Sequence, residues 1–299
     1  ENLYPYDLEV DAENLPALKP FSTQEELIEK SVKCLDEVDS FFFFFFSIMN
    51  NMNYLDLNSR KGKAPGGYNM TLPEIGVPFI FMNAAGTHRD LETMVHEAGH
   101  AVHSFLMRTL PYNFDQEISS EMAELASMSM ELMTFDGLDA FYNEADKKRA
   151  IETHLEGIIT MLPWIALIDK FQHWIYTNPN HTNEERENKW EELHKELSSD
   201  VIDYSPYADF RKTMWHKQLH IFEVPFYYIE YGIAQLGAIA VWRNYKQNKQ
   251  KALEDYKNAL KLGYTKSIPE MYKAAGIEFN FTAAYVKELM EFLNKEIGQ

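Results

Sequence analysis

The chain has 299 residues, of which 45% are hydrophobic, enough to form a large core in one domain or in two lobes. Its 46 acidic and 28 basic residues give a net charge of −18, which argues against nucleic-acid binding because that function requires a basic surface. Cys34 is the single cysteine, so the chain can form neither an internal disulfide nor a thiolate cluster for a metal. A single cysteine fits a reducing compartment, and we expect a cytoplasmic location.

Helical periodicity dominates the chain. We predict helices at 23–50, 87–109, 117–134, 138–175, 182–199, 207–218, 224–262, 267–276 and 281–297. Short strands are predicted at 54–57, 66–70 and 78–83, separated by glycine and proline turns. The predicted fold class is therefore mainly α, with one small β-sheet.

The most apolar runs lie at 41–46 and 157–168. Both are shorter than the stretch of about 20 residues that crosses a bilayer, so we expect no membrane association. The first run is six consecutive phenylalanines, which cannot all face one side of a helix. Some of them must contact another element, and a chain exposing such a surface alone would tend to form a homodimer.

Residues 96–100 read His-Glu-Ala-Gly-His within the predicted helix at 87–109. Positions four apart are about one helical turn apart, so His96 and His100 project from the same face and can hold one zinc ion. Glu97 is placed beside them to accept a proton from a water molecule. A chance match on a surface helix is the alternative. The apolar residues at steps of three and four favour a buried helix: Leu91, Met94, Val95, Ala98, Val102, Phe105 and Leu106.

A third metal ligand is expected from the predicted helix at 117–134, because catalytic zinc generally has three protein ligands and one open position. Glu121, Glu124 and Glu131 share one face of this helix. Glu124 is the preferred ligand, since its small neighbours would let the two helices approach closely, and Glu121 is the second candidate. Glu131 and Ser127 lie on the same side and either orient a ligating histidine or are ordinary helix-surface groups.

The other histidines in predicted helices are expected to be structural. His103 is better explained by packing or hydrogen bonding than by metal ligation. His154, His173 and His194 lie in charged or amphipathic helices with no carboxylate cluster nearby in the sequence.

These motifs resemble those of the thimet oligopeptidase and oligoendopeptidase F family of zinc peptidases. The stretches that carry the resemblance are residues 3–8, 60–68, 87–103, 123–127, and His220 followed by 226–231. The first is similar to the Leu-Arg-Pro-Trp-Asp segment that opens the family's catalytic region, and the second resembles its glycine-rich stretch. The last resembles the family's substrate-facing His and Tyr cluster.

The resemblance implies a mainly α, gluzincin-like catalytic domain with a small sheet near the active site. Family members are about twice as long, so residues 1–299 are expected to be the C-terminal catalytic region. The N-terminal half of the same parent protein, absent from this chain, would form the opposite wall of a deep channel. The family's ligand set implies one zinc per chain, held by His96, His100 and Glu124.

The implied function is a zinc-dependent endopeptidase that cleaves internal bonds of short peptides, with Glu97 as the base. The resemblance assigns His220 and at least one of Tyr227, Tyr228 and Tyr231 to stabilising the oxyanion. Neighbouring residues on a helix point about 100° apart, so at least one of these tyrosines is expected to be core. A small sheet beside the zinc helix further suggests that an edge strand binds the substrate backbone.

Two alternatives to this function remain open. The chain could be a catalytically incompetent fragment that binds zinc or peptide without its N-terminal half. It could also be a metallocarboxypeptidase of related helical fold, which would release single C-terminal residues.

Overall fold

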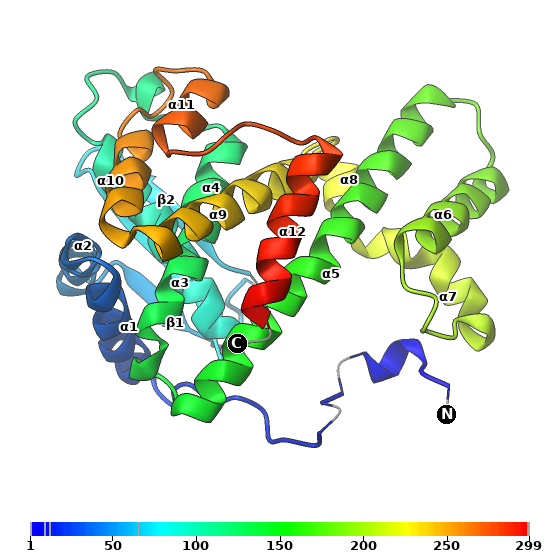
Figure 1. The fold of residues 1–299 in the computed structure, drawn as a ribbon, viewed down its shortest axis with the longest axis horizontal. Coiled ribbons are helices and arrows are strands. Elements are labelled where there is room, and N and C mark those ends of the chain that lie inside the picture. Colours follow the sequence, from blue (N-terminus) through cyan, green and yellow to red (C-terminus); the bar gives the residue numbers. More distant parts are fainter. Residues whose placement is uncertain (1, 9, 12, 65, 298–299) are drawn as a thin grey trace. The chain divides into compact units, whose positions relative to one another are not determined.

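The computed structural model describes residues 2–8, 10–11, 13–64 and 66–297 (Figure 1). Pro65, in the glycine-rich stretch at 60–68, lies outside the described residues. The chain divides into two compact units. Unit 1 comprises the described residues of Glu1–Pro16 and Glu156–Gly232, and unit 2 those of Ala17–Leu155 and Ile233–Gln299.

The first half of the chain contains both helices and strands, which are α1 (Gln24–Val38), α2 (Ser40–Asn51), β1 (Leu55–Asn58), β2 (Tyr68–Leu72), β3 (Val77–Ala84), α3 (His88–Met107) and α4 (Ser120–Met133). Helices follow, which are α5 (Glu144–Thr177), α6 (Asn183–Leu197), α7 (Ala208–Thr213), α8 (His220–Glu223), α9 (Ile229–Gln247), α10 (Lys249–Leu260), α11 (Ile268–Ala274) and α12 (Ala283–Ile297). The protein is thus mainly α, as predicted.

The three predicted strands form one small sheet in unit 2, in the order β1-β3-β2. β1 runs parallel to β3, with Leu55 opposite Ile80, and β2 runs antiparallel to β3, with Tyr68 opposite Phe81. Helix α3 packs against β2 and β3. β2 is therefore an edge strand beside the helix that carries the His-Glu-Ala-Gly-His motif.

Helix α3 is buried along the face that the sequence predicts. All seven apolar residues of the predicted stripe are buried. Thr87 caps the helix: its hydroxyl accepts a hydrogen bond from the Asp90 amide, and the Asp90 carboxylate accepts one from the Thr87 amide at 2.8 Å. The motif lies in the middle of this fixed, buried helix, so its side chains project from a rigid support.

The prediction of one helix at 23–50 is wrong, because Asp39 separates α1 from α2. Asp39 is extended, with φ −161°, and its carboxylate accepts a hydrogen bond from the Phe41 amide at the start of α2. The phenylalanine run divides as expected: Phe42 and Phe46 are buried, whereas Phe44 is 56% exposed.

The prediction of one helix at 224–262 is also wrong. Phe226 has a positive φ of 64°, which a helix does not allow, and α9 begins only at Ile229. Asn248 then ends α9 and caps α10 by accepting a hydrogen bond from the Lys251 amide. The segment of tyrosines that follows His220 is therefore partly loop.

Among the described residues, α5 is long and apolar enough to be a candidate membrane span by length and composition. The apolar run at 157–168, which is too short by itself to cross a bilayer, lies within this helix. Core helices of many proteins meet the same criteria, so this finding is weak evidence, and the absence of a membrane span stays a prediction.

Candidate functional site

His96 and His100 on α3 and Glu124 on α4 form a group of ligand atoms that could hold one metal ion. These atoms lie within 4.8 Å of one another. Nε2 of His96 is 3.4 Å from Oε2 of Glu124, and Nε2 of His100 is 3.9 Å from the same oxygen. Two ligands on one tetrahedral zinc lie about 3.4 Å apart, so the donor set fits a single ion of this size.

The close approach of α3 and α4 brings these ligand atoms together. A Cβ added to Gly99 would lie 2.6 Å from the Ser127 Cα and 2.8 Å from the Ala126 carbonyl oxygen. Only glycine permits such contact between helix backbones. The small residues around Glu124 therefore act as the sequence suggested, and Glu121, the second candidate, is not a member of the group.

The group attracts positive charge. Nδ1 of His96 lies 2.5 Å from Oε1 of Glu131, so carboxylates face both of its ring nitrogens. Burial lowers the pKa of His96, but the hydrogen bonds with Glu124 and Glu131 outweigh burial and raise this pKa to about 10. Burial lowers the pKa of His100 to about 4, which keeps its imidazole neutral and able to bind a metal. The carboxylates that face His96 and the neutral ring of His100 both favour a bound metal cation.

Glu97 is 6% exposed, and its Oε2 has no hydrogen-bond partner among the described residues. Burial raises the pKa of Glu97 to about 7. The residue borders a cavity of about 400 Å³ whose lining includes Gly66, Gly67, Thr93 and His96. An unpaired carboxyl that titrates near neutral pH and faces a cavity can both accept and release a proton.

Ser127 and Glu131 contact the ligand residues directly. The Ser127 hydroxyl donates to Oε2 of Glu124 at 3.2 Å, so it orients the glutamate and not a histidine. Glu131 accepts from His96, as one of its two predicted roles required. His154, which was expected to be structural, lies against Glu92 and Glu131, two carboxylates that are distant from it in the sequence.

The remaining predicted site residues form a cluster in unit 1. His220 lies on α8, Tyr227 and Tyr228 precede α9, and Tyr231 lies within α9. The ring centroids of the tyrosines are 6.1, 4.9 and 5.7 Å from that of His220, in the same order. The structure thus brings the four residues together, although not on one continuous helix.

A hydrogen-bond chain that sequence reasoning missed fixes the ring of His220. The Trp164 indole N–H donates to Oε1 of Gln218 at 3.1 Å, which leaves the amide nitrogen of Gln218 to donate to Nδ1 of His220 at 2.7 Å. A ring that accepts at Nδ1 is neutral and carries its proton on Nε2, 3.5 Å from the Tyr231 hydroxyl. Burial also lowers the pKa of His220, in keeping with a neutral ring.

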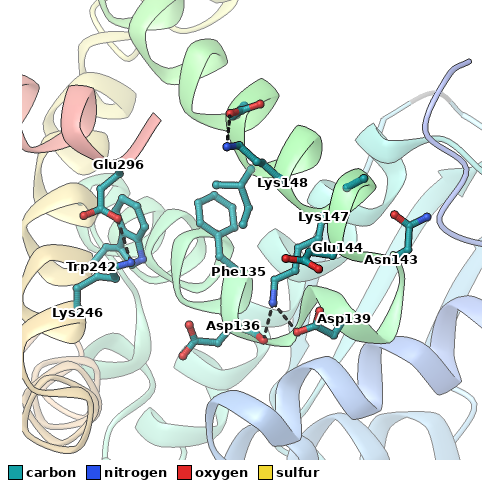
Figure 2. Close-up of a pocket in the computed structure, with 13 residues that line it drawn as sticks. Phe135, Asp136, Asp139, Asn143, Glu144, Lys147, Lys148, Trp242, Lys246 and Glu296 are labelled. Carbon is teal, nitrogen blue, oxygen red and sulfur yellow. Dashed lines mark hydrogen bonds and ion pairs between the residues drawn. The ribbon is translucent and has the colours of Figure 1, made fainter. Parts of the chain in front are cut away.

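A larger cavity in unit 2, of about 840 Å³, has none of the metal-ligand residues in its lining (Figure 2). Phe135 and Trp242 form part of its wall. Two of its lysines pair with carboxylates of the lining: Lys147 bonds Asp139 at 2.5 Å and Lys246 bonds Glu296 at 2.9 Å. The smaller cavity beside Glu97 is the better candidate for chemistry, because it combines a metal-ligand group with an unpaired carboxyl.

The other histidines are placed largely as expected. His103 is 1% exposed, and burial lowers its pKa to about 3. His194 is also buried, and His173 is exposed with Asp169 as its neighbour at 3.5 Å. None of them belongs to the metal-ligand group.

Comparison with known proteins identifies the family of this chain. The chain belongs to peptidase family M3, whose sequence model matches residues 6–291. It is 24% identical over 286 residues to an oligoendopeptidase F homolog of Borreliella burgdorferi and 26% identical over 296 residues to one of Mycoplasma genitalium. These matches cover 93% and 92% of this chain but 47% of each relative, so the chain spans about half the length of these curated relatives.

Solved structures share the fold. A structure of PZ peptidase A with an inhibitor superposes with a TM-score of 0.87 at 30% identity, covering 99% of this chain and 53% of that one. A structure described as an oligoendopeptidase F of Bacillus anthracis superposes with a TM-score of 0.85 at 29% identity, covering 100% and 50%. The expected family and fold class are thus confirmed.

Proposed function

We propose that the protein is a zinc-dependent endopeptidase that hydrolyses internal bonds of short peptides. The observation that carries the proposal is the group of His96, His100 and Glu124 with the unpaired carboxyl of Glu97 beside it. Two histidines and one glutamate are a common ligand set of catalytic zinc. Membership of peptidase family M3 supports peptides as the substrate.

Zinc bound by these three residues would polarise the scissile carbonyl and lower the pKa of water to about 7. Glu97 then accepts the proton of the attacking water and passes it to the leaving amine. Its burial and raised pKa support both steps, because a group that titrates near the working pH can accept and release the proton. Ser127 and Glu131 hold the ligand side chains of Glu124 and His96 in place through their hydrogen bonds.

We further propose that His220 and at least one of Tyr227, Tyr228 and Tyr231 stabilise the oxyanion of the tetrahedral intermediate. The chain from Trp164 through Gln218 supports this role, because it keeps His220 neutral with an N–H at Nε2. A neutral donor in a fixed orientation is what oxyanion stabilisation requires.

The edge strand β2 is the proposed binding site for the substrate backbone. Gly67 directly precedes it and lies close to the catalytic carboxyl, since a Cβ on Gly67 would be 3.5 Å from Oε1 of Glu97. A peptide added alongside β2 would therefore run past Glu97. A side chain at position 67 would therefore narrow the space in which the peptide passes Glu97.

The proposal concerns the whole protein, since this chain spans about half of its curated relatives. We propose that residues 1–299 form the C-terminal catalytic region, that an N-terminal half is its partner, and that the protein is cytoplasmic. A homodimer is proposed for the isolated region, where the exposed Phe44 would favour self-association.

Hydrolysis of a quenched fluorescent peptide by the whole protein tests the proposed function. We expect turnover that a chelator abolishes and that added zinc restores. Mass spectrometry of the products should show cleavage at internal bonds. Release of single C-terminal residues would instead identify a metallocarboxypeptidase, and peptide binding without cleavage would identify a binding protein.

A further inference from the structure

A series of buried and partly buried polar side chains extends from the metal-ligand group within unit 2. Oε1 of Glu131 lies 2.5 Å from Nδ1 of His96, and Oε2 of Glu131 lies 3.3 Å from Nε2 of His154. Nδ1 of His154 lies 2.7 Å from Oε1 of Glu92. The members come from α3, α4 and α5, so the contacts connect three helices around the site.

Both ring nitrogens of His154 face carboxylates. A carboxylate only accepts hydrogen bonds, and a neutral imidazole has a single N–H to donate. Nδ1 makes a hydrogen bond with Glu92 and Nε2 makes an ion-pair contact with Glu131, and an imidazolium between the two carboxylates accounts for both contacts. A buried positive charge with a carboxylate on either side is paired, and its charge is thereby compensated.

The electrostatics of the pair agree with this geometry. Burial alone would lower the pKa of His154, but its hydrogen bond with Glu92 and the charges of Glu131 and Glu92 outweigh burial and raise the pKa. Burial opposes ionisation of Glu92 as well, yet the hydrogen bond and charge of His154 lower the pKa of Glu92 to about 2. Arg89, 3.3 Å from Glu92, and His88, 3.6 Å away, also face this carboxylate, and Tyr142 interacts with its charge.

The residues around Glu92, at the end of this series of contacts, are also held in place. Nδ1 of His88 lies 2.8 Å from the Tyr142 hydroxyl, and the ring of Phe135 packs edge-on against His154 with centroids 5.3 Å apart. His154 is 8% exposed, whereas Glu92, Glu131 and His96 also line the cavity beside Glu97. These contacts leave His154 and Glu92 little freedom to rotate.

We propose that His154 is a positioning residue of the metal centre. As an imidazolium anchored by Glu92, it holds one oxygen of Glu131 so that the other accepts the Nδ1 proton of His96. His96 then presents the lone pair of Nε2 toward the metal in a fixed orientation. This inference depends on the metal-binding part of the proposed function, and it assigns a role to His154 that its sequence context does not indicate.

The test is zinc affinity of the whole protein, measured by competition with a chromophoric chelator. Partners that orient zinc ligands typically contribute about 10-fold to 100-fold in affinity, and we expect His154→Gln to weaken zinc binding by about 10-fold. His103→Gln is the matched control, because His103 is also a buried histidine of unit 2 but is neither a member of the metal-ligand group nor a partner of Glu92 or Glu131. The control is expected to bind zinc within about 2-fold of the unsubstituted protein, because it leaves the contacts of His96, Glu131, His154 and Glu92 intact.

A second measurement does not depend on how the variant folds. Nitrogen-15 NMR of the unsubstituted protein should show two N–H protons on His154 at neutral pH. A neutral His154 ring, or unchanged zinc affinity in a folded His154→Gln variant, would overturn the proposal, as would a protein that binds no zinc. Zinc affinity that depends on His154 in a protein that cleaves no peptide would overturn the proposed function alone.

Discussion

Gly99 lies so close to Ser127 that a Cβ on residue 99 would be 2.6 Å from the Ser127 Cα. Because the contact is with backbone, Gly99→Ala should force α3 and α4 apart and destabilise the protein by about 1–3 kcal/mol. Zinc binding should weaken as well, since the histidines lie on α3 and Glu124 on α4. Thermal unfolding and zinc competition measure the two effects.

Gly157→Ala is the control for this substitution. Gly157 also lies inside a helix, α5, but a Cβ there would contact nothing within 4 Å. Alanine should therefore stabilise the helix by about 0.5–1 kcal/mol. If both variants unfold at the same temperature, the close approach of α3 and α4 does not depend on Gly99.

Substitution of Glu97 should remove turnover, whereas substitution of Glu124 should remove zinc binding. Glu97→Gln should keep about one zinc per chain while removing most turnover, because the base is lost and the ligands are retained. Glu124→Gln should lose zinc. Metal analysis and peptide hydrolysis separate the two roles, and full zinc retention by Glu124→Gln together with loss by Glu121→Gln would show that Glu121 is the third ligand.

His220→Ala should lower kcat and kcat/KM together, by about 10²-fold to 10³-fold, with zinc content unchanged. One or more of Tyr227→Phe, Tyr228→Phe and Tyr231→Phe should do the same. Steady-state kinetics with metal analysis on the whole protein provide the measurement. Near-normal kcat in all four variants would make the cluster core packing only.

Gln218 should affect turnover, because its hydrogen bond fixes the tautomer of His220. Gln218→Leu removes the donor to Nδ1, so the proton of His220 is no longer confined to Nε2. We expect a lower kcat with little change in KM, and NMR of His220 should show a mixture of tautomers. A variant whose His220 keeps its proton on Nε2 would contradict the role given to Gln218.

Buried His194 should make the stability of unit 1 depend on pH. Burial, helped by the charges of Arg211 and Lys217, lowers the pKa of His194 to about 4, whereas the unfolded chain has the ordinary value of about 6.5. Between these values the unfolded state binds a proton that the folded state does not, so stability is complete above pH 6.5 and falls as the pH drops toward 4, by about 2–3 kcal/mol. Urea unfolding across this range should show a smaller fall in His194→Gln, and an identical fall would exclude His194 as its source.

The sequence predicts elements whose cause is local. The stripe of α3 and the three strands follow from periodicity and turn residues, and all are confirmed. Two of the errors lie where one polar side chain interrupts a periodic pattern, as Asp39 and Asn248 do by capping the next helix. Apolar spacing continues across such residues, so periodicity alone does not reveal the break.

Part of the site could be recognised in the same way, because His96, His100 and Glu97 lie within one helical turn. The partners of His154 could not. Glu92 and Glu131 are 62 and 23 residues away from it in the sequence, and they meet it only because α3, α4 and α5 pack together. Similarly, nothing in the spacing of Trp164, Gln218 and His220 indicates that they form a hydrogen-bond chain.

The most direct test of the metal centre is a crystal structure of the zinc-loaded whole protein, with diffraction recorded on either side of the zinc absorption edge. The anomalous signal should lie about 2.0–2.2 Å from Nε2 of His96, Nε2 of His100 and a carboxylate oxygen of Glu124. A zinc peak at another place, or one bound by Glu121 and not by Glu124, would contradict the account.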